Sequence, residues 1–245
     1  MRLSRIFVDQ TLDEGAQIQL DSDSSHYVKN VLRLKHDATI LLFNGKDLFD
    51  YKSQLCYEGK KALARIQSRV GGYSESVLST EIIQGLSRSD HMDWMIQKCT
   101  ELGVTRISIF NAQYTQITLK SAQLKKRLLH WQNVAIKACE QCGRHYPPQL
   151  NFEQSLIEIL GPGISADLKI LLDFKGERLR PEGKAKNSTG QVAILLGPEG
   201  GLSDSEIKAA LNADFTATRL GPRVLRTETA AAAALAIVQY NFGDL

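Results

Sequence analysis

Three charged residues near the end of the chain have the types and spacing that could do chemistry: Glu199, Arg223 and Arg226. Glu199 belongs to the Gly-Pro-Glu-Gly-Gly run at 197–201, and both arginines belong to the Gly-Pro-Arg loop at 221–226. A carboxylate can accept a proton, and a guanidinium group can stabilise an anion as it develops. Their presence in two similar loops favours a ligand site there.

Each of these loops connects an apolar run to a helix. The runs 192–196 and 215–220 predict strands, and helices are expected from Asp204 and from Thr227, which is expected to cap its helix. Strand, glycine loop and helix N-terminus in succession build ligand sites in open α/β sheets, because glycine lets the backbone approach a ligand closely. One such loop could be an ordinary turn. Two loops with the same Leu-Gly-Pro start favour a ligand site.

Neither loop is a usual nucleotide-binding loop. A phosphate-binding loop needs G-x-x-x-x-G-K-[ST], and a dinucleotide site needs G-x-G-x-x-G with an acidic residue about twenty positions later. The loops here read G-P-E-G-G and G-P-R, and no lysine follows either set of glycines. A nucleotide-dependent enzyme is therefore disfavoured.

From residue 77 the chain alternates predicted strands and helices, which is typical of a mostly parallel, doubly wound sheet. Strands are expected at 78–86, 106–112, 149–152 and 168–174, and helices at 90–102, 121–142 and 154–160. Residues 175–190 are expected to form a polar loop. Trp94 and Trp131 are expected in the core because they lie on apolar helix faces.

Residues 1–72 predict a small β-barrel. Its strands are expected at 5–8, 17–20, 39–43, 48–56 and 61–70. One short helix, capped by Ser24 or Ser25, interrupts them. The flexible sequence Gly71-Gly72-Tyr73-Ser74 is the candidate boundary, so the predicted domains are 1–72 and 73–245.

The composition of the 245 residues limits the classes of protein. A hydrophobic fraction of 43% is enough for a core. No apolar stretch reaches the roughly 18–20 residues of a membrane span, and no signal peptide is recognisable. Four cysteines without secretory features predict reduced thiols and a cytoplasmic protein. The net charge of +3 is too small to indicate a nucleic acid partner, so any such partner needs a local basic patch.

The pair Cys139 and Cys142 forms a C-x-x-C at the end of a predicted helix. A zinc site would need a second ligand pair, and a thioredoxin-like role would need a helix N-terminus. We therefore predict no metal. Arg144 follows a glycine stop, where it either projects freely or satisfies the helix dipole.

Basic residues near the start of the chain allow two interpretations. Lys29, Arg33 and Lys35 surround the short helix, and Arg2 and Arg5 open the chain. They form either a solvated surface or a set of phosphate contacts.

Three motifs together resemble one known family. LLGPEGGLS (195–203), RLGPRVLRTETA (219–230) and ACEQCGR (138–144) are similar to the RsmE-type branch of the SPOUT RNA methyltransferases, and the resemblance covers essentially the whole chain. It implies an α/β protein with an N-terminal PUA-like β-barrel that binds RNA. A C-terminal SPOUT α/β domain with a parallel sheet and a trefoil knot would follow.

The resemblance also implies an activity. These enzymes methylate N3 of one uridine in small-subunit (16S) ribosomal RNA, with S-adenosylmethionine as the methyl donor, and they act as homodimers. The alanine-rich run 230–234 either packs within the chain or, as the resemblance implies, lies in or near the dimer interface. The implied partners are ribosomal RNA or the small ribosomal subunit, with no membrane. The alternative is a non-catalytic RNA-binding protein whose cofactor site has degenerated.

Candidate roles follow for particular residues. Arg226 would stabilise the uracil anion, Glu199 would take the N3 proton or hold the glycine loop, and Arg144 would reach the RNA or the partner's site. The expected cofactor-binding residues are Leu172, Leu196, Gly197, Gly201, Leu220, Gly221 and Leu225. The expected substrate-binding residues are Arg2, Arg5, Lys29, Arg33, Lys35 and Arg223.

Overall fold

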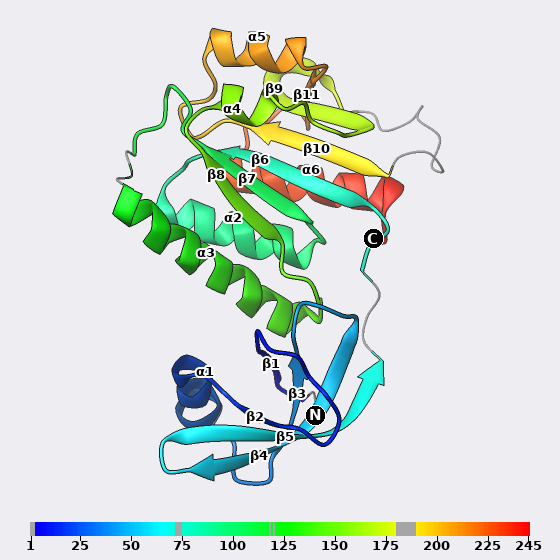
Figure 1. Ribbon diagram of the computed structural model, residues 1–245. Coiled ribbons are helices and arrows are strands. Elements are labelled where there is room, and N and C mark those ends of the chain that lie inside the picture. Colours follow the sequence, from blue (N-terminus) through cyan, green and yellow to red (C-terminus); the bar gives the residue numbers. More distant parts are fainter. Residues whose placement is uncertain (1–2, 72–74, 118, 120, 180–189) are drawn as a thin grey trace. The chain divides into compact units, whose positions relative to one another are not determined.

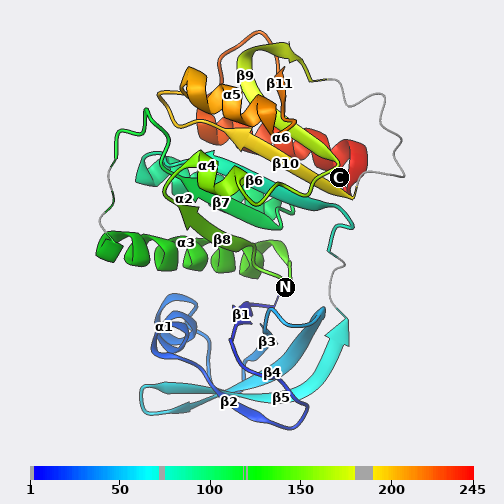
Figure 2. The same cartoon turned by 45° about the horizontal axis from the view of Figure 1, so that its top comes forward.

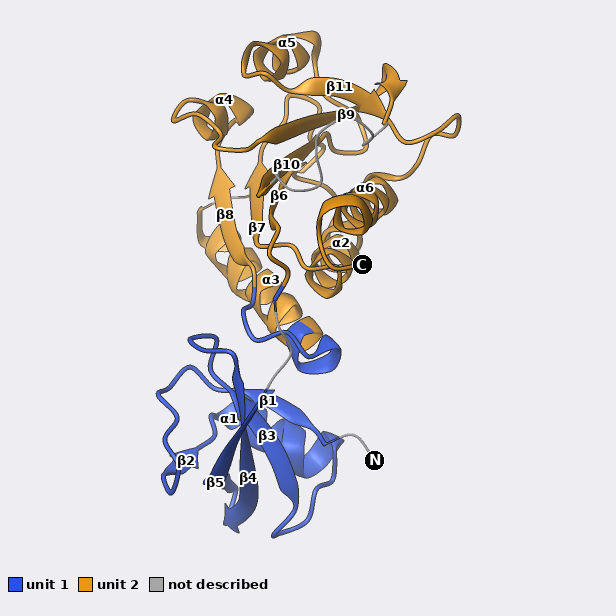
Figure 3. Cartoon of the chain, turned by 90° about the vertical axis from the view of Figure 1, so that its right-hand side faces the viewer, with its two compact units in different colours: residues 1–75, 139–147 blue, residues 76–138, 148–245 orange. Residues whose placement is uncertain are grey.

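The protein is described by a computed structural model covering residues 3–71, 75–117, 119, 121–179 and 190–245 (Figures 1 and 2). The chain forms two compact units (Figure 3). Unit 1 consists of residues 1–75 and 139–147, and unit 2 of residues 76–138 and 148–245. The sequence prediction divided the chain only once, at residue 72, and did not foresee that a later segment returns to the first unit.

Unit 1 contains a five-stranded sheet in the order β1-β3-β4-β5-β2. β1 is parallel to β3, and the other neighbouring strands are antiparallel. Its elements are β1 (Arg5–Phe7), β2 (Gln17–Gln19), α1 (Ser22–His26), the π-helix η1 (Tyr27–Val31), β3 (Thr39–Phe43), β4 (Phe49–Glu58) and β5 (Lys61–Gly71).

The cap of the short helix differs from the prediction. Asp21 caps α1, and its side chain accepts a hydrogen bond of 2.7 Å from the amide of Ser24. Ser24 and Ser25 are buried within the helix, and Ser25 donates to the carbonyl of Leu20. The predicted cap at either serine is therefore wrong, because Asp21 caps the helix by accepting from the backbone amide of Ser24, one of the amides that a helix start leaves free.

A buried charge network lies at the centre of unit 1. Nε and Nη2 of Arg5 both donate to Oδ1 of Asp50, at 3.0 and 2.9 Å, and Nε also lies 3.2 Å from Oδ2. The guanidinium lies 4.3 Å from the centre of the Phe43 ring. Arg5 is 6% exposed. The expectation that Arg5 contacts phosphate is wrong, because its guanidinium is buried and donates hydrogen bonds inside the protein.

The same network holds the segment 139–147. Arg5 donates to the carbonyls of Cys139 and Arg144, at 2.7 and 3.2 Å. The fully buried His145 lies 3.2 Å from Asp50 through its Nε2 atom. Buried charges persist only where they are paired and hydrogen-bonded. These contacts therefore explain why 139–147 belongs to unit 1.

Unit 2 contains a six-stranded parallel sheet in the order β11-β9-β10-β6-β7-β8. The alternating pattern predicted this class correctly. The strands are β6 (Ser79–Gly85), β7 (Arg106–Phe110), β8 (Gln149–Glu153), β9 (Leu168–Arg178), β10 (Gln191–Leu196) and β11 (Thr216–Arg219). The helices are α2 (Ser89–Glu101), α3 (Ser121–Cys142), α4 (Leu156–Leu160), α5 (Asp204–Asn212) and α6 (Thr227–Phe242). The last turn of α3 lies in unit 1.

Helices cover both faces of this sheet, with α2, α3 and α6 on one face and α4 and α5 on the other (Figures 1 and 2). Neighbouring residues of one strand point to opposite faces of the sheet. Ile194 therefore packs on the face covered by α2, α3 and α6, and Leu195 on the face covered by α4 and α5. Trp131 is buried as predicted. Trp94 is 42% exposed, so its predicted core position is wrong. No helix among the described residues has the length and apolar character needed to cross a membrane.

Strand β9 is longer than predicted. It runs to Arg178 and pairs with β11 across an irregularity between Ala217 and Thr218. A side chain at Gly176 would come within 2.4 Å of the amide nitrogen of Thr218. The polar residues 175–178 are therefore strand rather than the predicted loop, because backbone pairing at the sheet edge overrides their composition. Residues 180–189 lie outside the described part of the chain.

We predict that Asp50→Asn lowers the unfolding free energy at neutral pH by about 3–5 kcal/mol, because it leaves the Arg5 charge buried and uncompensated. Burial alone would raise the pKa of Asp50, but hydrogen bonds from His145 and Arg5 bring it below the ordinary value of 3.8. The stabilisation is thus present above that value and lost as the pH falls further. Denaturant unfolding between pH 2 and 7 measures both effects.

The control is Asp9→Asn, which removes the exposed ion pair with Lys46 and should change stability little. Equal stability of Asp50→Asn and the wild type at pH 7 would contradict the importance of the buried pair.

Candidate functional site

Unit 2 contains a cavity of about 670 Å³ at the carboxyl ends of β10 and β11. Residues 171–175, in the middle of β9, line it as well. This is the position where open α/β sheets bind ligands. Its walls are formed by residues 91, 171–175, 196–199, 201–202, 204, 207, 218–221, 223–228 and 230. Both Leu-Gly-Pro loops therefore border one cavity.

The first loop is held tightly by its own backbone. A side chain at Gly197 would come within 2.8 Å of the carbonyl carbon of Gly201. Gly201 has a φ of +74°, in the left-handed region that favours glycine, and its amide donates to the carbonyl of Pro198 at 2.8 Å. Glycine is thus required at 197 by the turn itself, a constraint that the sequence did not reveal.

The loop ends in a capping box that begins α5. The side chain of Ser203 accepts from the amide of Glu206, and the carboxylate of Glu206 accepts from the amide of Ser203 at 2.8 Å. Each side chain satisfies a backbone group that the helix leaves free. The helix start at Asp204 is therefore as predicted, and the loop is fixed at its far end.

A buried polar cluster joins the two loops. The side-chain nitrogen Nε2 of Gln84, near the end of β6, donates to the carbonyl of Gly197 at 3.1 Å and contacts the hydroxyl of Thr227 at 3.0 Å. That hydroxyl also donates to the carbonyl of Gly197, at 2.8 Å. Thr227 does not cap α6 as predicted; Arg226 occupies the cap position without a side-chain bond. The Thr227 hydroxyl instead connects the start of α6 to the first loop through the carbonyl of Gly197.

Glu199 is fixed in the cavity wall. Its Oε1 atom accepts from the backbone amide of Arg88 at 3.1 Å and lies 2.8 Å from Nδ1 of His91. Burial alone would raise the pKa of Glu199, but hydrogen bonds from the amides of Arg88 and Glu199 and from His91 lower it below 4.5. The group is therefore ionised at neutral pH but is a weak base.

The structure brings most of the predicted site residues to this cavity. They are Leu172, Leu196, Gly197, Glu199, Gly201, Leu220, Gly221, Arg223, Leu225 and Arg226. The cavity adds His91, Asp173, Phe174, Thr218, Arg219 and Glu228, which the sequence reasoning missed. No local motif marks His91, but Glu228 falls inside the recognised motif RLGPRVLRTETA.

Arg144 does not project freely. Its Nε atom lies 2.8 Å from Oε2 of Glu75, and the side chain is 13% exposed. Burial raises the pKa of the nearby Cys139 thiol to about 12, which keeps it protonated and unreactive. The segment around the C-x-x-C thus packs inside unit 1.

The N-terminal basic residues differ in their surroundings. Lys29, Arg33 and Lys35 are exposed. Lys29 donates to the carbonyl of Gly59 at 2.7 Å and lies 5.4 Å from the centre of the Tyr57 ring. Arg2 lies outside the described residues.

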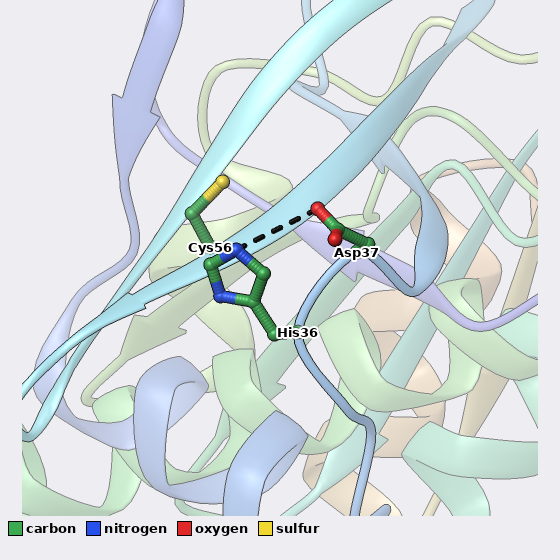
Figure 4. A group of neighbouring side chains, drawn as sticks. All are labelled: His36, Asp37 and Cys56. Atoms are coloured by element: carbon green, nitrogen blue, oxygen red, sulfur yellow. Dashed lines mark ion pairs between the residues drawn. The ribbon is translucent and has the colours of Figure 1, made fainter.

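One group in the described part of the chain has side chains that could hold a metal: His36, Asp37 and Cys56 in unit 1 (Figure 4). Nε2 of His36 lies 3.6 Å from Oδ1 of Asp37, and both side chains are more than half exposed. A closed structural zinc site uses four protein ligands, and this group offers three. It contributes nothing to the cavity of unit 2.

The parallel sheet with a cavity bounded by two glycine loops defines an α/β ligand-binding protein. Residues 74–239 match the family model described as an RNA methyltransferase domain. The chain is 30% identical to ribosomal RNA small subunit methyltransferase E of Buchnera aphidicola from Schizaphis graminum, over 100% of this chain and 98% of that protein. It is 27% identical to the Bacillus subtilis protein of that name, over 98% and 97%.

Two solved structures match the whole chain. A protein from Legionella pneumophila, solved with the bound cofactor S-adenosylmethionine, has a TM-score of 0.94, with 32% identity and 100% of both chains covered. Ribosomal RNA small subunit methyltransferase E from Neisseria gonorrhoeae, also with S-adenosylmethionine, has a TM-score of 0.88 at the same identity and coverage. The chain belongs to the RsmE family of RNA methyltransferases. The barrel closure and the trefoil knot stay predictions.

We predict that Gln84→Leu loosens the first loop, because the carbonyl of Gly197 then loses its side-chain amide donor. The unfolding free energy should fall by about 1–3 kcal/mol, and amide hydrogen exchange in 197–203 should accelerate. Exchange mass spectrometry measures this directly. Gln67→Leu, at an exposed position in β5, is the control. Unchanged exchange at 197–203 would show that the loop does not depend on Gln84.

Proposed function

We propose that this protein transfers the methyl group of S-adenosylmethionine to N3 of a uridine in small-subunit ribosomal RNA. The observation that carries the proposal is the joining of both Leu-Gly-Pro loops at one cavity, in a chain similar over its full length to structures solved with that cofactor. Such a substrate implies action in the cytoplasm.

The cofactor site we propose has apolar walls and a polar rim. Leu196, Leu220 and Leu225 would contact the adenine and ribose, and Leu172 would form the floor. Main-chain groups beside Gly197 would supply hydrogen bonds. Small-molecule sites of this kind combine apolar walls with a few fixed polar groups.

The proposed reaction forms a bond between the methyl carbon and uracil N3. The bond from that carbon to the sulfonium sulfur breaks, S-adenosylhomocysteine leaves with that electron pair, and the N3 proton passes to water. Arg226 begins α6 at the cavity, where its charge would stabilise the anion that develops on a uracil carbonyl. We assign Glu199 to holding the loop, because it is a weak base with two hydrogen-bond donors already on one oxygen.

Methylation mapping tests the function. Ribosomal RNA from cells with and without the gene should differ at one uridine, and the purified protein should restore that methyl group with S-adenosylmethionine. Binding of RNA without cofactor binding by calorimetry would favour the non-catalytic alternative. Methylation at a base other than uridine would contradict the N3 assignment.

We predict that Arg226→Ala lowers the single-turnover rate by about 10²–10³-fold with saturating cofactor, the scale for one charge-stabilising donor. Cofactor affinity should change little. Glu199→Gln should instead weaken cofactor binding and leave the shape of the pH–rate profile unchanged. A wild-type rate for Arg226→Ala would remove its catalytic role, and a flattened pH profile for Glu199→Gln would restore that carboxylate as the proton acceptor.

Lys29, Arg33 and Lys35, which are exposed around the short helix of unit 1, would bind RNA phosphates. We predict that Arg33→Ala with Lys35→Ala weakens RNA binding and reduces the salt dependence of the affinity by about one unit of slope per lost contact. Cofactor binding should not change. Lys46→Ala, which breaks an exposed pair with Asp9, is the control. An unchanged salt slope would assign the two residues to a solvated surface.

We also propose that the protein works as a homodimer. Helix α6 is apolar on its outer side as well, where Tyr240 is 73% exposed, and it packs beside α2, where Trp94 is 42% exposed. Large exposed apolar side chains of this kind are enriched at interfaces between proteins. Sedimentation analysis measures the oligomeric state, and a fully active monomer would contradict the proposal.

A further inference from the structure

A histidine connects two carboxylates in the wall of the cavity. Nδ1 of His91, in the first turn of α2, lies 2.8 Å from Oε1 of Glu199 and 3.8 Å from Oε2 of Glu228. Glu199 belongs to the loop after β10, and Glu228 to the first turn of α6. One imidazole ring thus contacts the two segments that bring the glycine loops to the cavity.

The carboxylates are shielded from solvent. The side chain of Glu228 is 11% exposed and that of Glu199 is 29% exposed. Oε2 of Glu228 is buried without a hydrogen-bond partner among the described residues. Like charges repel strongly where water screens them poorly. A cation between them would offset that repulsion.

We propose that His91 is a positioning residue whose positive charge holds the Glu199 loop and the start of α6 together around the cofactor. His91 takes no part in the chemical step. The nature of the cavity's ligand rests on the proposed function above. The contact itself rests only on the geometry of His91, Glu199 and Glu228.

The charged groups that face His91 come from each element packed against it. They are Glu199, Glu228 and, on its own helix, Asp90, whose carboxylate is 3.8 Å from Nε2 and 81% exposed. Imidazole is the side chain whose charge ordinarily changes between about pH 5 and 8. Glu199 stays ionised across that range, since its pKa is lowered. A protonated His91 attracts both carboxylates and a neutral one does not, so the contact is tested at both ends of that range.

Two substitutions at His91 separate charge from shape. At pH 6, His91→Gln should weaken S-adenosylmethionine binding about tenfold, a typical coupling for neighbouring groups, measured by calorimetry. His91→Lys keeps a permanent cation, so its affinity should stay within about twofold of the wild type at pH 6 and show no pH dependence up to pH 8.5. The wild type should lose affinity over the same range.

A substitution at Glu228 tests the proposed repulsion between the two carboxylates. Adding Glu228→Gln to His91→Gln removes one of the two carboxylates, so affinity at pH 6 should recover most of the tenfold loss. If the carboxylates act by attracting the cationic cofactor, the double variant should bind still more weakly. That result overturns the proposal, as would wild-type affinity in His91→Gln or an unaltered pH profile in His91→Lys.

A cofactor-free measurement separates this proposal from the proposed function. The melting temperature of His91→Gln should fall below that of the wild type more at pH 6 than at pH 8.5, and equal differences at both would overturn the proposal. If no variant binds the cofactor but this thermal pattern holds, the proposed function fails and the positioning contact stands. His130→Gln is the matched control, because His130 makes a 2.8 Å contact with Asp93 and does not line the cavity.

Discussion

The site of this protein depends on the burial of one side-chain amide. Gln84 is 1% exposed at the end of a central strand, where an unsatisfied amide would be costly. Its nitrogen contacts the carbonyls of Gly85 and Gly197 and the hydroxyl of Thr227. Gly85 is the next residue of β6, whereas Gly197 belongs to the first glycine loop and Thr227 to the first turn of α6. The buried amide thus links both segments of the site to the end of the central strand.

Near the uncharged cluster of Gln84 and Thr227, the charged residues Glu199 and Arg226 have different surroundings. Glu199 uses one carboxylate oxygen to accept from Arg88 and to contact His91, which favours a part in holding the loop. Arg226 is exposed at the cap position of α6, where its guanidinium can face a ligand. Two charged residues that line the same cavity thus differ in how far other groups of the protein hold them. Their hydrogen-bond partners distinguish the two.

The basic residues of unit 1 show the same division. Arg5 forms a buried ion pair with Asp50, whereas Arg33 and Lys35 are exposed on the surface. The guanidinium of Arg5 donates to Asp50 and to two backbone carbonyls at once, which the ammonium group of a lysine would match poorly. Composition alone did not separate these residues. An RNA contact can therefore be expected only from those that burial leaves exposed.

The sequence by itself determined the α/β class, the positions of nearly all strands and helices, and the two loops of the site, because hydrophobic period and glycine placement act locally. It could not determine that segment 139–147 returns to unit 1, that β9 continues through 175–178, or that Thr227 bonds Gly197 instead of capping its helix. It also missed His91, which meets Glu199 from 108 positions away. Each of these depends on partners distant in the chain, and only tertiary packing brings such partners within hydrogen-bond distance.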